Sequence, residues 1–150
     1  MSEEYSDWEL HTGRLIVSFG DIELLTYKLF DSWIKDKKAR RYTLGDRLDK
    51  LIGCVESAPD QSGELVEIKT LLKDVKELNE IRNLVAHNPT ILKNFDDINL
   101  KPLLTDLREE KEPLSLEQLH EHANKALSLK AKLFIKVSQY TKIGIDQLFS

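Results

Sequence analysis

Residues 64–87 read ELVEIKTLLKDVKELNEIRNLVAH, and this stretch decides the fold. Its apolar residues recur at steps of three and four, the period of one face of an α-helix: Leu65, Ile68, Leu71, Leu72, Val75, Leu78, Ile81 and Val85. Asn88 and Pro89 follow. Proline disfavours the helical conformation of the residue before it and has no N–H to continue the hydrogen-bond ladder. The stretch therefore predicts a long helix that ends at His87.

The same period lies upstream of this helix. A first helix is predicted from about Tyr5 to Lys37, a run without proline whose apolar positions are Leu10, Leu15, Val17, Ile22, Leu25, Leu29, Trp33 and Ile34. A shorter second helix is predicted after Thr43, which is a suitable N-cap for the apolar residues from Leu44 to Val55.

A last helix is predicted downstream, to about Thr141, because Ser115 and Gln118 have the spacing of a capping box. Residues 90–112 mix short apolar stretches with Asn, Asp and Pro, which favours either a long irregular connection or a small hairpin. We therefore expect one all-α domain over residues 1–150, an up-and-down bundle of four to five helices.

Composition excludes several classes of protein. The chain has 150 residues, 41% hydrophobic and 32% charged, and a net charge of −4, so it lacks the positive field of a general nucleic-acid or membrane binder. A single cysteine, Cys54, forms no intramolecular disulfide and supplies no zinc set. The acidic N-terminus is unlike a secretory signal, and apolar runs stop at three or four residues. We expect a cytoplasmic protein without a membrane partner.

The residues with chemical potential lie in the last turns of the 64–87 helix. Asn83 and His87 are some 40° apart around a helix, and Arg82 lies roughly 140° from His87. One helix therefore presents a split site, and two copies across a two-fold axis would line one cleft with both sets of side chains. An imidazole with a pKa near about 6.5 can take a proton from a ribose 2′-hydroxyl or donate one to the leaving 5′-oxygen. A guanidinium holds the phosphate oxygens, so such a cleft suits RNA cleavage and needs neither metal nor cofactor.

The spacing Arg82-Asn83-x-x-x-His87, at the end of a long helix of an all-α domain, resembles the HEPN superfamily, whose motif is Arg, four to six residues, then His. The stretches 77–81 and 88–89, and a first helix with an acidic residue at Glu23, are also similar to its members. The resemblance implies a homodimeric, metal-independent endoribonuclease, commonly a bacterial toxin or phage-defence effector. Arg82 and His87 would then be catalytic, Asn83 and Glu23 supporting. Members paired with a nucleotidyltransferase antitoxin often carry tyrosine two residues after the histidine, where this chain has Pro89.

Two other functional interpretations remain open. The same cleft could belong to a non-catalytic module that binds a nucleotide or a protein partner, such as an antitoxin or regulator. Arg82 and His87 could be an ordinary pair near a helix C-terminus, where the helix dipole favours cations, within a plain structural bundle.

The basic cluster from Lys35 to Arg41 is interpreted as a solvated helix end rather than an RNA contact. The histidines outside the motif, His11, His120 and His122, are expected at the surface.

Overall fold

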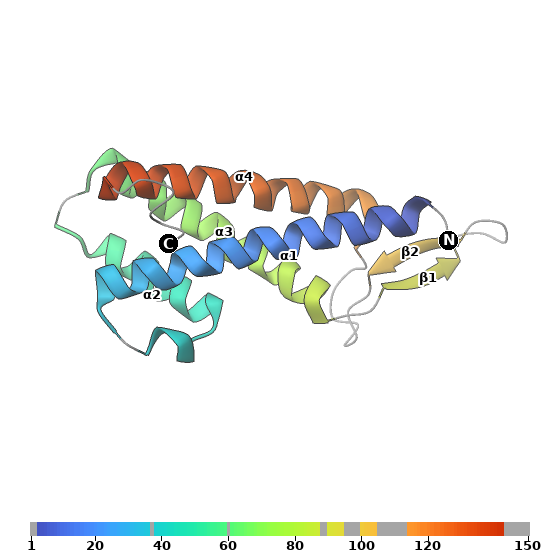
Figure 1. Ribbon diagram of the computed structural model, residues 1–150, viewed down its shortest axis with the longest axis horizontal. Coiled ribbons are helices and arrows are strands. Elements are labelled where there is room, and N and C mark those ends of the chain that lie inside the picture. Colours follow the sequence, from blue (N-terminus) through green and yellow to red (C-terminus); the bar gives the residue numbers. More distant parts are fainter. Residues whose placement is uncertain are drawn as a thin grey trace.

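The computed structural model describes residues 3–36, 38–59, 61–87, 90–94, 100–104 and 114–142, and the description is confined to them. Within these ranges four α-helices form a bundle, with a small hairpin at one end (Figure 1). The helices are α1 (Glu3–Leu29), α2 (Leu44–Glu56), α3 (Gly63–His87) and α4 (Leu116–Thr141). The helical bundle predicted from the apolar period is therefore confirmed.

The first helix ends earlier than its apolar pattern predicts. A single π-helical turn, Phe30–Ile34, continues α1, and Lys35 then adopts a left-handed conformation with φ of 57°. The N–H of Lys35 donates to the carbonyl of Phe30 at 3.0 Å, which closes the helix. The predicted end at Lys37 lies outside the described residues, and a 3₁₀ turn at Ala39–Arg41 follows.

Both predicted N-caps are present. The Thr43 hydroxyl accepts a hydrogen bond from the Asp46 backbone N–H at 3.2 Å at the start of α2. At the start of α4, the Ser115 hydroxyl accepts from the Gln118 N–H at 3.2 Å, and the Gln118 side chain accepts from the Ser115 N–H at 2.9 Å. Each cap satisfies N–H groups that the first turn of a helix leaves without partners.

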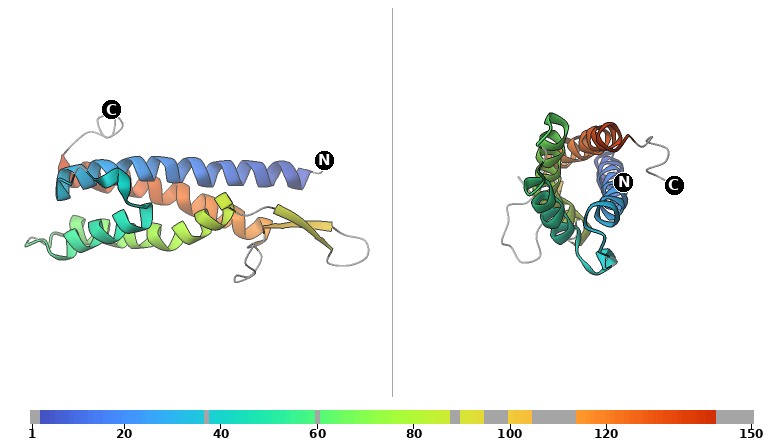
Figure 2. Two further views of the ribbon diagram at one scale, coloured as in Figure 1. Left: turned by 90° about the horizontal axis from the view of Figure 1, so that it is seen from below. Right: turned by 90° about the vertical axis from the view of Figure 1, so that its left-hand side faces the viewer.

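The three long helices lie side by side, with α3 running opposite to α1 and α4 (Figures 1 and 2). The alternation expected of an up-and-down bundle thus holds for α3 and α4, but α1 and α4 run in the same direction. Between α3 and α4 the chain forms the hairpin that was one of the two expectations there. Its strands are β1 (Thr90–Asn94) and β2 (Leu100–Leu104), paired antiparallel with Leu92 opposite Pro102.

One hydrophobic core runs along the bundle. It is built from the inward stripes of all four helices, and its fully buried members include Leu15, Phe19, Ile22, Leu25, Leu48, Leu51, Ile68, Leu72, Leu119 and Leu133. Two positions assigned to the apolar stripe of the first helix are not in this core, because Leu10 and Val17 are exposed on the outer face of α1. In the described ranges, none of the helices combines the length and the apolarity required to cross a lipid bilayer.

Candidate functional site

The C-terminal turns of α3 carry the candidate site. Leu78, Leu84 and Val85 are buried and fix this part of α3 in the bundle. Arg82 lies beside that buried stripe, so its side chain remains only 20% exposed. Asn83 and His87 face outward and are exposed. The apolar period of the helix thus leaves one partly covered cation next to two accessible polar side chains.

Three groups hold the Arg82 guanidinium. Its Nη2 lies 2.5 Å from Oε1 of Glu23 on α1, and its Nη1 donates to the side-chain oxygen of Asn83 at 2.9 Å. Its Cζ lies 5.8 Å from the ring centre of Phe19, within the range of a cation–π contact. Because Phe19 and Glu23 are one helical turn apart, Arg82 is clamped against a single face of α1.

The Glu23–Arg82 pair is an interhelical contact at the edge of solvent. The Glu23 side chain is 32% exposed, so neither partner is fully desolvated. A guanidinium has five N–H donors, and the contacts with Glu23 and Asn83 engage two of its nitrogens. Arg82 is therefore oriented by its neighbours while keeping donors for an anionic group that approaches from outside.

His87 stands apart from this cluster. It is the last residue of α3 and is exposed, and its imidazole makes neither a hydrogen bond nor an ion pair with the described residues. The structure thus brings together Arg82, Asn83 and Glu23, three of the four residues singled out from the sequence. In a single copy of the chain, His87 is presented next to them rather than bonded to them.

A row of buried polar groups lies next to Glu23 and links α1 to α2. The Thr26 hydroxyl, fully buried, donates to the backbone carbonyl of Glu23 at 2.7 Å and accepts from Nε of Arg47 on α2 at 3.2 Å. Arg47 is itself 1% exposed, donates to the Tyr42 carbonyl at 2.6 Å and stacks at 3.9 Å on the ring of Tyr27. Sequence reasoning missed this row, although Arg47 falls in the buried register of α2 beside Leu48.

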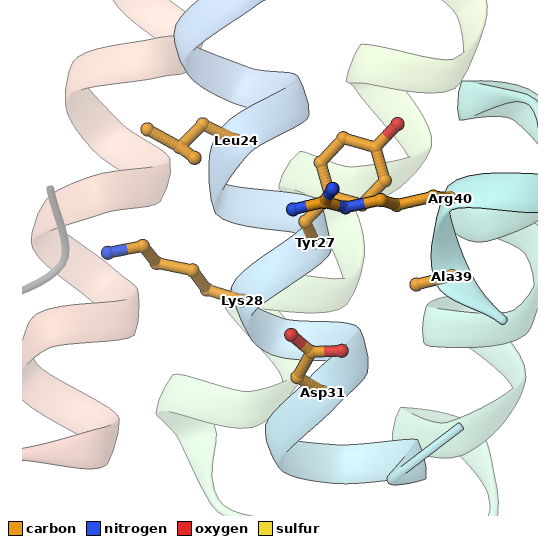
Figure 3. A pocket seen from close by; sticks show the side chains of 6 residues that line it. All are labelled: Leu24, Tyr27, Lys28, Asp31, Ala39 and Arg40. Atoms are coloured by element: carbon orange, nitrogen blue, oxygen red, sulfur yellow. The ribbon is translucent and has the colours of Figure 1, made fainter. Parts of the chain in front are cut away.

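A cavity of about 650 Å³ opens one helical turn beyond Glu23 along α1 (Figure 3). Its wall combines α1 with the short turn that follows it: Leu24, Tyr27, Lys28, Asp31, Ala39 and Arg40. Arg40, from the predicted basic cluster, therefore reaches the same side of α1 as the candidate site. The far side of the Tyr27 ring is covered by Arg47.

Two histidines outside the motif meet across the bundle. The rings of His11 on α1 and His120 on α4 stack with centres 4.3 Å apart, so His11 is half-buried rather than a surface residue. Burial, followed by the charges of His120 and Arg14, lowers the pKa of His11, and Asp7 opposes this shift. Burial, followed by the charge of Lys125, also lowers the pKa of His122.

Within the described ranges, histidine, cysteine and acidic side chains form no group of three that could hold a metal ion. Comparison with known proteins was negative throughout: the chain matches no family model, no curated protein and no solved structure.

Proposed function

We propose that the protein is a metal-independent endoribonuclease of HEPN type that acts as a homodimer. The observation that supports this proposal best is the clamp on Arg82, a partly covered cation held by Glu23 and Asn83 and followed on the same helix by the exposed His87. A guanidinium can stabilise the charge on a phosphate, and an accessible imidazole can transfer the protons, in phosphodiester cleavage at a ribose.

Arg82 is the electrostatic group in this proposal. Its remaining N–H donors bind the non-bridging oxygens of the scissile phosphate, whose negative charge grows as the 2′-oxygen attacks. Glu23 is a positioning residue in this proposal, because its carboxylate contacts the guanidinium of Arg82. Asn83 holds the other side of the guanidinium and presents its amide N–H groups to the substrate.

His87 transfers the protons. One imidazole takes the proton of the 2′-hydroxyl, the 2′-oxygen bonds to phosphorus, and the bond from phosphorus to the 5′-oxygen breaks. A second imidazole, the His87 of the other copy, gives its proton to the departing 5′-oxygen. The products carry a 2′,3′-cyclic phosphate and a 5′-hydroxyl, and DNA is not a substrate because it lacks the attacking group.

The homodimer is part of the same proposal, since each copy supplies one His87 and one Arg82. The biological setting we propose is that of a cytoplasmic toxin or phage-defence effector, with RNA as its target and an antitoxin or regulatory protein as a further partner. No cofactor is needed for this chemistry, because proton transfer and charge stabilisation come from side chains.

The test is cleavage of a labelled single-stranded RNA by the purified full chain in the presence of EDTA. We expect cleavage by the wild type, and loss of at least about a hundredfold in rate for His87→Ala and for Arg82→Ala, the scale of losing an acid–base or charge-stabilising group. Matched controls are His122→Gln and Arg41→Ala, which remove a histidine and an arginine away from the site. Equal activity in the His87 and His122 variants would rule out the proposed roles.

The alternative is a non-catalytic module that binds a nucleotide or a protein at the same place. The observation in its favour is that Glu23 already neutralises Arg82 within one copy, which suits a site for reversible binding. A wild-type protein that leaves RNA intact, yet gains thermal stability with a nucleotide in a way that Arg82→Ala abolishes, would select this function.

A further inference from the structure

Between Leu10 and Leu24, the outward face of α1 is apolar and has no charged residue along its centre, and the exposed Glu9 lies just before it. Its residues form what we call the α1 stripe, which consists of Leu10, Gly13, Ile16, Val17, Gly20 and Leu24. Val17 is 65% exposed, Leu10 56% and Leu24 39%, although each is a large apolar side chain. A helix that faces water normally carries polar residues on that face, so the stripe points to a binding partner.

The two glycines make this face flat. A Cβ atom added at Gly13 or Gly20 would meet no atom within 4 Å, so neither glycine is required by packing inside the chain. Glycine within a helix costs about 1 kcal/mol relative to alanine. Small residues between larger apolar ones let a second helix approach closely, which gives these two positions a purpose.

The stripe is complementary to itself when two copies run antiparallel. Leu10, Gly13, Val17, Gly20 and Leu24 follow one another at steps of three and four, as in the seam of a coiled coil. A two-fold axis at Val17 sets Leu10 of one copy against Leu24 of the other, and brings Gly13 to within one residue of the level of Gly20. Such an interface is isologous, the usual form in homodimers.

Charges beside the stripe favour the same orientation. On its α4 side, at intervals of seven residues, lie Asp7, Arg14, Asp21 and Lys28, which alternate in sign. Antiparallel copies keep these two flanks on one side of the interface, with Asp7 near Lys28 and Arg14 near Asp21, which are opposite charges in both pairs. Asp21 also pairs with Lys130 of α4 at 3.0 Å, so a second copy would join an existing ion pair.

We propose that the α1 stripe is the surface on which a second copy of this chain docks, antiparallel, with the two-fold axis at Val17. The stripe leads into the cavity lined by Leu24 and Lys28, so the Asp7–Leu10 end of the second copy comes to the rim of that cavity (Figure 3). From residue 6 to residue 29, α1 offers a band about 35 Å long and 11 Å wide. The area of that band is only about half of the roughly 800 Å² that each partner buries in a standard interface. The neighbouring surfaces of α3 and α4 would contribute the rest of the buried area.

The side of the α1 stripe that adjoins α3 carries the candidate site. The proposed interface therefore rests on the homodimer of the proposed function. A two-fold axis that passes between the antiparallel α1 helices keeps the α3 flanks of both copies on one side. Arg82 contacts Glu23 and so lies at its level along α1. Because α3 runs opposite to α1, His87, five residues after Arg82, lies closer to the N-terminus of α1, at about the level of Val17. The two His87 residues therefore lie near the height of the axis, and each Arg82 lies about 7.5 Å from it along its own α3.

Disulfide trapping without RNA tests the interface directly. In a Cys54→Ser background, Val17→Cys should form a covalent dimer on mild oxidation, because residue 17 faces its own copy and disulfides need Cα atoms within about 7 Å. Leu10→Cys and Leu24→Cys should each stay uncrosslinked alone and crosslink when the two proteins are mixed. The matched control is Ile135→Cys, an exposed apolar position on α4 at 45% exposure, which should not crosslink.

The mass in solution gives the second readout. Wild type and Ile135→Asp should be dimers by light scattering, and Val17→Asp should have half that mass with an unchanged helical spectrum. A monomeric wild type, or a dimer that Val17→Asp leaves intact, overturns the inference. If the dimer forms as described and RNA is not cut, the proposed function fails while the interface stands.

Discussion

The contact between Glu23 and Arg82 gives the sharpest prediction about energetics. The pair joins α1 to α3, and its side chains are 32% and 20% exposed. Charges about 4 Å apart attract by about 4 kcal/mol at an effective dielectric constant of about 20, and desolvation and side-chain ordering offset much of that. Exposed pairs contribute about 0.2–1 kcal/mol, and loss of one partner from a fully buried pair costs about 3–5 kcal/mol. A partly covered pair should therefore show a coupling of about 1–2 kcal/mol.

A double-mutant cycle measures this coupling. Glu23→Gln, Arg82→Met and the double variant are compared with wild type by urea unfolding, and each kcal/mol should also appear as about 2–4 °C in the melting temperature. Glu56 and Lys73 form the control pair, 3.4 Å apart with side chains about half exposed. For Glu56→Gln and Lys73→Met, the coupling should be below about 0.5 kcal/mol.

The reasoning is refuted if the Glu23–Arg82 coupling is no larger than that of the control pair. Additivity within about 0.5 kcal/mol would mean that Arg82 is held by packing on Phe19 and not by the carboxylate. The assignment of Glu23 as a positioning residue would then be wrong, whatever the ribonuclease assay shows.

Three further predictions concern the bundle itself. The free energy of unfolding should fall as pH decreases from about 7.5 to about 5.5. The fold lowers the pKa of His11 below 6.5, so the unfolded chain binds more protons in this range. Urea unfolding of His11→Gln should show a smaller fall. Ser115→Ala should cost about 1 kcal/mol in urea unfolding by removing the cap of α4, while Ser128→Ala, exposed in the middle of that helix, should be neutral or slightly stabilising. Arg47→Ala should cost about 3 kcal/mol, and Arg47→Met less than half of that in the same assay, because methionine keeps the buried volume; equal losses would contradict this.

The sequence predicted the helices because burial of an apolar face imposes its period on the residues. The end of α3 at His87 and the capping of α4 by Ser115 were predictable for the same local reason, since Pro89 and Gln118 act within a few residues. The register of Glu23 against Arg82 was not readable. It depends on how α1 and α3 lie against each other, and the two residues are 59 positions apart in the sequence.

Other features cannot be predicted from the spacing of apolar residues alone. Arg47 occupies a core position as a cation, and such a rule passes over it. The stack of His11 on His120 joins positions 109 residues apart. Val17 was wrongly predicted to be buried, because its spacing from its apolar neighbours fits a helical stripe. However, α1 has two apolar faces, and only the packing of the bundle shows which of them is buried.

End-group analysis of the RNA products tests the central claim most directly. The full chain is incubated with a single-stranded RNA in EDTA, and the 3′ ends of the products are identified by mass spectrometry. The account predicts 2′,3′-cyclic phosphates, produced by wild type and Arg41→Ala and absent with His87→Ala or with a substrate carrying a 2′-deoxyribose at the cut site. Intact RNA, or products that end in 3′-hydroxyl groups, would contradict it.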